Sequence, residues 1–224
     1  MTFYLTLDAS ERSLLGVARE ASDGTIEECA RELSEDARHH VENLTPMVAR
    51  VLEAAGIERP DVVVVGTGPA SFTGLRSGLM TARALAWAWG VPIVGVSSLE
   101  VIALAACEAG AEEVVACIDA RRKELFALRA RALGSDDVEV IDEACVIRPD
   151  NVPEMVAERP ATLAVQREDL YPEYLANARV HQCGPATMAR LARARMRRAE
   201  AGESALLSTE PQYLRRPDIH GMTS

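Results

Sequence analysis

The segment best placed to bind a ligand or partner is Gly66 to Arg76, which reads G-T-G-P-A-S-F-T-G-L-R. It lies between the apolar run Val62–Val65 and an alanine-rich stretch with helical periodicity. A helix that starts after a strand and a tight turn presents unpaired N–H groups at the positive end of its dipole. The spacing fails the common phosphate motifs, because Ser71 stands where the dinucleotide pattern needs glycine and no Gly-Lys-Ser/Thr follows. The segment therefore predicts a ligand or partner site, or else a plain strand-to-helix turn.

Residues suited to catalysis or metal binding are few. Ser71 lies in no G-x-S-x-G elbow. Five scattered cysteines without C-x-x-C favour neither a disulfide framework nor a zinc site, and the apolar context of Cys117 favours a buried thiol over a nucleophile. The adjacent His39 and His40 would diverge by about 100° on a helix, which favours a structural or interface role over a shared metal ion. We therefore predict neither a catalytic residue nor a metal site.

Composition limits the class of protein. The chain has 224 residues, of which 48% are apolar, so it can bury a sizeable core. Its net charge of −10 argues against broad nucleic-acid binding by this chain alone. The N-terminus lacks the basic and apolar regions of a signal peptide, and no window approaches the roughly 20 apolar residues of a membrane span. We expect a cytoplasmic protein.

Two similar runs of elements are expected along the chain. The first run comprises five strands: Phe3–Leu7, Leu14–Arg19, a third strand that ends at about Cys29, Asp61–Gly66 and Pro92–Val96. Its helices are expected at Glu35–Ala54, at Leu75–Trp89 and from Ser97 or Ser98 to Ala109. The second comprises strands at Val114–Asp119, Glu124–Arg131, Val138–Ile141 and Thr162–Gln166, with helices at Val152–Glu158 and Ala186–Arg198. Pro46 should kink or break the first helix.

The two runs begin alike. L-D-A at Leu7–Ala9 matches I-D-A at Ile118–Ala120, and L-L-G-V at Leu14–Val17 matches L-F-A-L at Leu125–Leu128 with the same offset. A strand that ends in aspartate opens each run, which favours a duplicated α/β fold over chance similarity. We predict two lobes, residues 1–109 and the smaller 110–224, each with a mixed five-stranded sheet flanked by helices.

This layout resembles the actin-like ATPase superfamily (ribonuclease H-like fold), whose lobes grip a nucleotide through strand-ending aspartates and β-hairpins. Neither hairpin here has the glycine that lets backbone wrap a phosphate, and Glu11 would repel one. The resemblance implies a degenerate nucleotide cleft at Asp8, Ser10 and Asp119, with no cofactor expected. Asp8 and Asp119 could hold hydrated magnesium, but capping of their own turns is the favoured role.

More specific motifs resemble the TsaB family of tRNA threonylcarbamoyladenosine biosynthesis. The G-P-G-S-F-T-G-x-R signature is matched, except for Ala70, by Gly68, Pro69, Ser71, Phe72, Thr73, Gly74 and Arg76. Further matches are Pro92–Leu99, the H-x-E-x-L-x-P run from His40 to Pro46, D-A-R at Asp119–Arg121 and P-x-Y-L-R at Pro211–Arg215. They cover most of the chain but are sparse from about Val138 to Leu206.

Two residues depart from the family pattern. Ala70 replaces a glycine, which would strain the backbone by about 1 kcal/mol if that position needs positive φ. Lys123, the only lysine, stands where a glycine is usual after D-A-R-x.

The resemblance implies a non-catalytic subunit. Such proteins pair through N-terminal helices with TsaD, which transfers threonylcarbamoyl to N6 of adenosine 37 in tRNAs that read codons beginning with adenine. A TsaE ATPase binds the pair, the subunit alone forms a homodimer, any tRNA contact is indirect or weak, and no membrane is involved. By this resemblance the partner-binding residues would be His40, Met47, Met80, Arg83 and Trp87.

The sequence itself also favours a subunit. The helix at Leu75–Trp89 leaves no polar face over its last turns, and Trp87 and Trp89 diverge by roughly 200°, so both cannot enter one core. One should face a partner, unless the helix is sandwiched within its own domain. The alternative function is a small-molecule kinase or ATP-dependent transferase of the same superfamily, and a peptidase is a third. The last helix carries a basic stretch that should form a solvated face, or else contact tRNA or a partner; its residues are Arg190, Arg193, Arg195, Arg197 and Arg198.

Overall fold

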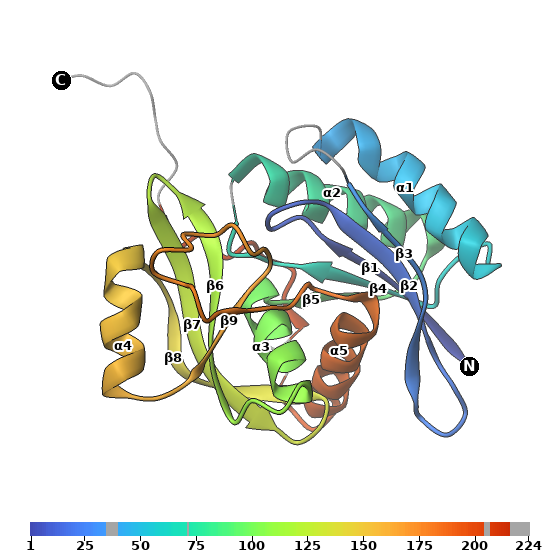
Figure 1. Ribbon diagram of the computed structural model, residues 1–224. Helices are drawn as coiled ribbons and strands as arrows, with labels where there is room; N and C mark the ends of the chain where they lie inside the picture. The colour runs from blue at the N-terminus through green and yellow to red at the C-terminus, as the bar shows by residue number, and fades with distance from the viewer. Residues whose placement is uncertain (35–39, 71, 204–206, 216–224) are drawn as a thin grey trace.

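Two five-stranded sheets lie on either side of a layer of helices in the computed structural model (Figure 1). The structure describes residues 1–34, 40–70, 72–203 and 207–215, with the backbone alone for residues 40–43. Among these residues, no helix is both long and apolar enough to cross a bilayer.

The first sheet has the order β3-β2-β1-β4-β5. Its strands are β1 (Thr2–Asp8), β2 (Leu14–Glu20), β3 (Ile26–Leu33), β4 (Val62–Gly66) and β5 (Ile93–Val96). The first three strands pair antiparallel, whereas β4 and β5 run parallel to β1. All five residues of β4 are buried, as expected for a central parallel strand covered on both faces.

The second sheet repeats this topology in the order β10-β9-β6-β7-β8. Its strands are β6 (Glu113–Arg121), β7 (Glu124–Leu133), β8 (Asp137–Ile147), β9 (Thr162–Val165) and β10 (Arg179–Val180). The opening hairpins also share their register, because Asp8 pairs with Leu14 and Asp119 pairs with Leu125. The predicted duplicated fold, with two mixed five-stranded sheets, is confirmed.

The helices form three layers (Figure 1). They are α1 (His40–Ala55), α2 (Phe72–Trp89), α3 (Ser98–Glu108), the 3₁₀ turn η1 (Pro149–Asn151), α4 (Val152–Glu158) and α5 (Pro185–Glu200). Helices α1 and α2 cover the outer face of the first sheet, and α4 lies on the outer face of the second. Helices α3 and α5 lie between the sheets, where α3 packs on the second and α5 on the first.

The largest hydrophobic cluster fills this middle layer. It joins inward residues of the first sheet, such as Val64, to Ile102 of α3, Ile118 of β6 and Leu191 of α5, which are all fully buried. Burial of this apolar surface is the main force that holds the two sheets together.

Several predicted boundaries need correction. Helix α2 begins at Phe72 rather than Leu75, β8 extends beyond Ile141 to Ile147 along its partner β7, and the short β10 was not predicted. Helix α1 is continuous through Pro46, which is exposed, so the predicted break does not occur there. The expected start of that helix, residues 35–39, lies outside the described residues.

Candidate functional site

The signature loop, residues 66–76, joins β4 to α2 and contains a cis peptide bond between Gly68 and Pro69. Gly68 has a φ of +86°, which glycine adopts without steric cost. Ala70 is not among the residues with positive φ and is 8% exposed, so the strain considered for this substitution does not arise. In the first turn of α2, Thr73 is exposed and Gly74 is buried, whereas Ser71 lies outside the described residues.

The motif Pro92–Leu99 packs beside the signature loop. The backbone N–H and the hydroxyl of Thr67 both donate to the carbonyl oxygen of Val96, at 2.8 and 3.1 Å. The backbone N–H of Ser98 donates to the carbonyl oxygen of Gly68 at 2.9 Å. Two motifs that are separate in the sequence therefore form one structural unit at the ends of β4 and β5.

A third segment, residues 207–215, crosses this unit, and we call it the C-terminal strap. The N–H of Gln212 donates to the carbonyl oxygen of Thr67 at 2.9 Å. A side chain at Gly95 would collide with the backbone of Ser208, so glycine permits the strap to lie against β5.

The strap also anchors the start of α2. The guanidinium of Arg76 lies 3.7 Å from the ring centroid of Phe72, and its Nε donates to the Tyr213 hydroxyl at 2.8 Å. The rings of Phe72 and Tyr213 are 5.2 Å apart. Cation–π and aromatic contacts of this kind fix exposed side chains in one orientation. The predicted residues Phe72 and Arg76 thus meet the P-x-Y-L-R motif.

Helix α2 presents an exposed apolar face beyond this anchor. Met80 is 63% exposed and Trp87 is 87% exposed, with Ala84 exposed between them. Trp89 is partly buried and packs on the protein's own core, so the expected divergence of the two tryptophans is confirmed. The exposed faces of α2 and the adjacent α1, which has exposed Ala49, are candidates for an interaction surface.

The other predicted partner-binding residues lie elsewhere. Met47 is 1% exposed and packs in the core between α1 and the first sheet, so the prediction that it contacts a partner is wrong. Arg83 donates to the carbonyl oxygen of Thr209 at 2.8 Å and to Glu210 at 3.0 Å, which ties α2 to the C-terminal strap. The side chain of His40 lies outside the described residues.

Asp8 and Asp119 cap their own hairpin turns, as predicted. The Asp8 carboxylate accepts the N–H of Ser10 at 3.0 Å, and that of Asp119 accepts the N–H of Arg121 at 2.8 Å. Asp8 also accepts the hydroxyl of Ser98 at 2.5 Å. These carboxylates therefore stabilise the two turns in equivalent ways.

Protein side chains bridge the two hairpins. The N–H of Asp119 donates to Glu11 at 3.3 Å, and Arg167 forms ion pairs with Glu11 at 3.8 Å and Asp119 at 3.3 Å. The amide of Gln166 donates to the Ser10 hydroxyl at 3.0 Å and to the sulfur of Cys183 at 3.1 Å. Burial raises the pKa of Glu11, although the Asp119 N–H and Arg167 act in the opposite direction.

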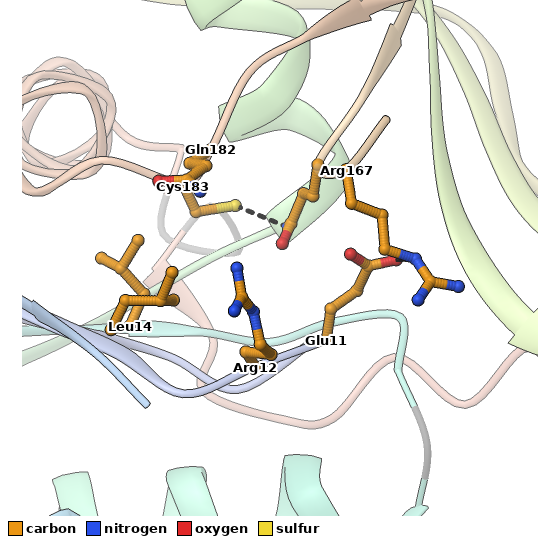
Figure 2. A pocket seen from close by; sticks show the side chains of 8 residues that line it. Glu11, Arg12, Leu14, Arg167, Gln182 and Cys183 are labelled. Carbon is orange, nitrogen blue, oxygen red and sulfur yellow. Dashed lines mark hydrogen bonds and ion pairs between the residues drawn. The ribbon is translucent and has the colours of Figure 1, made fainter. Parts of the chain in front are cut away.

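A small cavity of about 20 Å³ remains beside these residues, and Figure 2 shows Glu11 and Arg167 directed toward each other at its edge. A volume of this size suits one water molecule. The sequence analysis did not identify Gln166 and Arg167 as site residues. They lie in segment 166–178, which contains no helix, whereas the equivalent position of the first lobe is followed by α2.

Most arginines of α5 do not form the predicted solvated face, although Arg197 is exposed. Arg195 is 7% exposed and pairs with Glu100 at 2.6 Å and Asp137 at 3.2 Å. Arg190 pairs with Glu108, and Arg193 bridges Glu20 and Asp136, so α5 is pinned by ion pairs to both halves of the chain. These arginines form internal ion pairs because α5 lies between the sheets rather than on the surface.

The structure also shows where the cysteines and the possible metal ligands lie. Cys117 is fully buried and burial raises its pKa to about 12, which confirms the predicted inert thiol. Among the described residues, no three His, Cys, Asp or Glu side chains lie close enough to hold a metal ion. His39 lies outside the described residues.

Comparison with known proteins identifies relatives of this architecture. The family model described as TsaD, tRNA N6-adenosine threonylcarbamoyltransferase, matches residues 34–189. A protein of Escherichia coli named tRNA threonylcarbamoyladenosine biosynthesis protein TsaB is 38% identical over 112 residues, which cover 47% of this chain and 46% of that protein. The TsaB protein of Haemophilus influenzae is 39% identical over 92 residues, which cover 40% of this chain and 39% of that protein. The matched region thus spans less than half the length of these relatives.

The structural comparison extends over nearly the whole chain. A solved structure of YeaZ from Pseudomonas aeruginosa is 26% identical with a TM-score of 0.72, and the match covers 96% of this chain and 100% of that one. The two mixed sheets and the placement of the helices therefore form an actin-like, ribonuclease H-like fold. With the family model covering most of the chain and TsaB proteins among its relatives, this chain belongs to the TsaB family.

Proposed function

We propose that this chain is a non-catalytic subunit in the biosynthesis of threonylcarbamoyladenosine in tRNA. Its partner would be a TsaD-like protein that transfers the threonylcarbamoyl group to N6 of adenosine 37, and a TsaE-like ATPase would bind the pair. The names of its TsaB relatives and the matching TsaD family model support this process.

The exposed face of α2 carries the proposal. Met80 and Trp87 project from it, and tryptophan is among the residues that contribute most to protein–protein binding. We propose that this face, together with the exposed face of α1, binds the TsaD-like partner. The same face would form a homodimer when the chain is alone, so the two assemblies would compete.

A non-catalytic role agrees with the cleft. Asp8 and Asp119 cap turns, and Glu11, Gln166 and Arg167 bridge the two hairpins with their side chains. The alternative of a kinase or ATP-dependent transferase is not favoured, because neither hairpin carries the glycine that a phosphate grip needs. The lobe boundary near residue 109 also remains our proposal, supported by the repeated strand order.

Trp87→Asp tests the proposed interface. Loss of a central tryptophan contact typically costs about 2 kcal/mol or more, so we expect the dissociation constant of the heterodimer to rise at least about 30-fold. The measurement is size-exclusion chromatography with light scattering of this chain with the TsaD-like protein of its own organism. Met80→Asp should act in the same direction, whereas a charged residue at the buried Met47 would unfold the core.

Leu133→Asp is the matched control, because Leu133 is 45% exposed at the end of β7, away from α2. Circular dichroism should show that each variant is folded. Pairing that survives both Trp87→Asp and Met80→Asp, or that fails equally in Leu133→Asp, would contradict the proposed interface.

A further inference from the structure

The turn between β6 and β7 holds three consecutive cationic residues in left-handed backbone conformations. Arg121, Arg122 and Lys123 have φ values of 61°, 54° and 61°. Hairpin turns that require positive φ normally use glycine or asparagine, because these residues tolerate it best. Non-glycine residues kept in such conformations concentrate at functional sites, where their side chains are needed.

The three cationic residues of this turn lie on the surface, although Arg121 and Arg122 also have interaction partners within the chain. All three residues are exposed. The nearby carboxylates already have partners, since Asp119 pairs with Arg121 and Arg167. In the described part of the chain, Lys123 forms no ion pair of its own.

The C-terminal strap also reaches this turn. Arg215 donates to the carbonyl oxygen of Ala120 at 3.0 Å and forms an ion pair with Glu124. Two residues earlier, Tyr213 contacts Arg76 at the start of α2. The cationic turn is therefore joined by the strap to the helix that carries the exposed apolar face.

The composition of the turn favours a phosphate-rich partner over a protein. Between Asp119 and Glu124 the only apolar side chain is that of Ala120, which is 5% exposed. Protein interfaces have an apolar core and are depleted in lysine, whereas nucleic-acid contacts are made largely by Arg and Lys to backbone phosphates. On α5, Arg190, Arg193 and Arg195 are partly or fully buried and form internal ion pairs, whereas Arg197 is exposed.

We propose that the β6–β7 turn, with Arg121, Arg122 and Lys123, contacts the phosphate backbone of the tRNA substrate. The proposal rests on the proposed function for the identity of the RNA. The chain's overall charge of −10 would repel RNA elsewhere, so the turn would act as a local contact within the assembled complex.

The test is the affinity of an unmodified tRNA transcript for this chain, alone and mixed with its TsaD-like partner, over a series of salt concentrations. The double variant Arg122→Glu with Lys123→Glu should bind about tenfold or more weakly at low salt, and the slope of affinity against salt should fall by about 2. Lys123→Glu alone keeps the contacts of Arg122 and should show about half of the change in slope.

The matched control is Arg59→Glu with Arg179→Glu, which makes the same charge change at two exposed positions away from the turn. Loss of binding in the turn variants but not in the control supports the site. Equal loss in both pairs, or no tRNA binding by the wild-type chain in either sample, overturns it. Unchanged tRNA binding with loss of the heterodimer also overturns it and assigns the turn to a protein contact.

Light scattering of the same samples separates this proposal from the proposed function. If the wild-type chain pairs with the TsaD-like protein and the turn variants bind tRNA normally, only the proposed RNA contact is contradicted. If the wild-type chain does not pair with the TsaD-like protein but binds tRNA through the turn, only the proposed subunit function is contradicted.

Discussion

The replacement Gly66→Ala should destabilise the protein strongly, because Gly66 leaves room for a buried carboxylate. Gly66 ends β4 beside Asp8 at the end of the parallel strand β1. A Cβ atom at this position would lie 2.1 Å from an oxygen of the Asp8 carboxylate and 3.0 Å from the Ser98 hydroxyl. Asp8 is 1% exposed, so its side chain cannot move away without leaving its partners.

The magnitude follows from what must be displaced. The Ser98 hydroxyl donates to the Asp8 carboxylate at 2.5 Å, and a hydrogen bond to a carboxylate contributes about 1.5–3 kcal/mol. Insertion of a methyl group into a packed site costs about 1–3 kcal/mol in addition. We therefore expect the free energy of unfolding to fall by about 2.5–6 kcal/mol.

Urea unfolding followed by circular dichroism measures this change. The control is Gly184→Ala, because Gly184 has a φ of −63° and its nearest neighbouring atoms would be 4.0 Å from the new Cβ. That variant should lose less than about 1 kcal/mol. Ser98→Ala should have a smaller effect in the Gly66→Ala background than alone, since the bond it removes is already broken. A Gly66→Ala variant as stable as the Gly184→Ala control would refute this reasoning. Strictly additive effects of Gly66→Ala and Ser98→Ala on the free energy of unfolding would refute it as well.

Three further predictions concern strain, thiols and pH. Lys123→Gly should raise the free energy of unfolding by about 0.5–1 kcal/mol, because relief of a left-handed residue exceeds the entropy that glycine adds to the unfolded chain; a less stable variant in urea unfolding would contradict it. At mildly alkaline pH a thiol reagent should modify the exposed Cys29 and Cys145 first, whereas Cys117 and Cys183 should react only after unfolding, because burial raises their pKa values. The measurement is mass spectrometry of the labelled chain, and modification of Cys117 or Cys183 before unfolding would contradict the prediction. Burial raises the pKa of Glu100, so the stability that Glu100 contributes is full below its usual pKa and is lost as pH rises through the folded value. Relative to Glu100→Gln, the wild-type protein should therefore lose stability from acidic to neutral pH, and a constant difference in urea unfolding across that range would argue against it.

The sequence alone determined the order of elements and the duplication. Buried strands such as β4, the Asp-ended hairpins and the helical periodicity of α2 are local patterns, and local patterns are read without knowledge of partners. The prediction for Met47 was wrong, although the local spacing of apolar residues indicates that this side chain is buried. Met47 follows Leu44 by three residues and precedes Val51 by four, which places it on the buried stripe of α1.

Only the tertiary structure decided which distant segments meet. Tyr213 contacts Arg76 across 137 residues of sequence, Gln166 reaches Ser10 across 156, and Arg195 is buried because α5 lies between the two sheets. No periodicity encodes such contacts, since they depend on how the sheets and helices pack together. The composition of the β6–β7 turn was visible in the sequence, but its left-handed backbone and its link through the strap to α2 arise only from the folded arrangement.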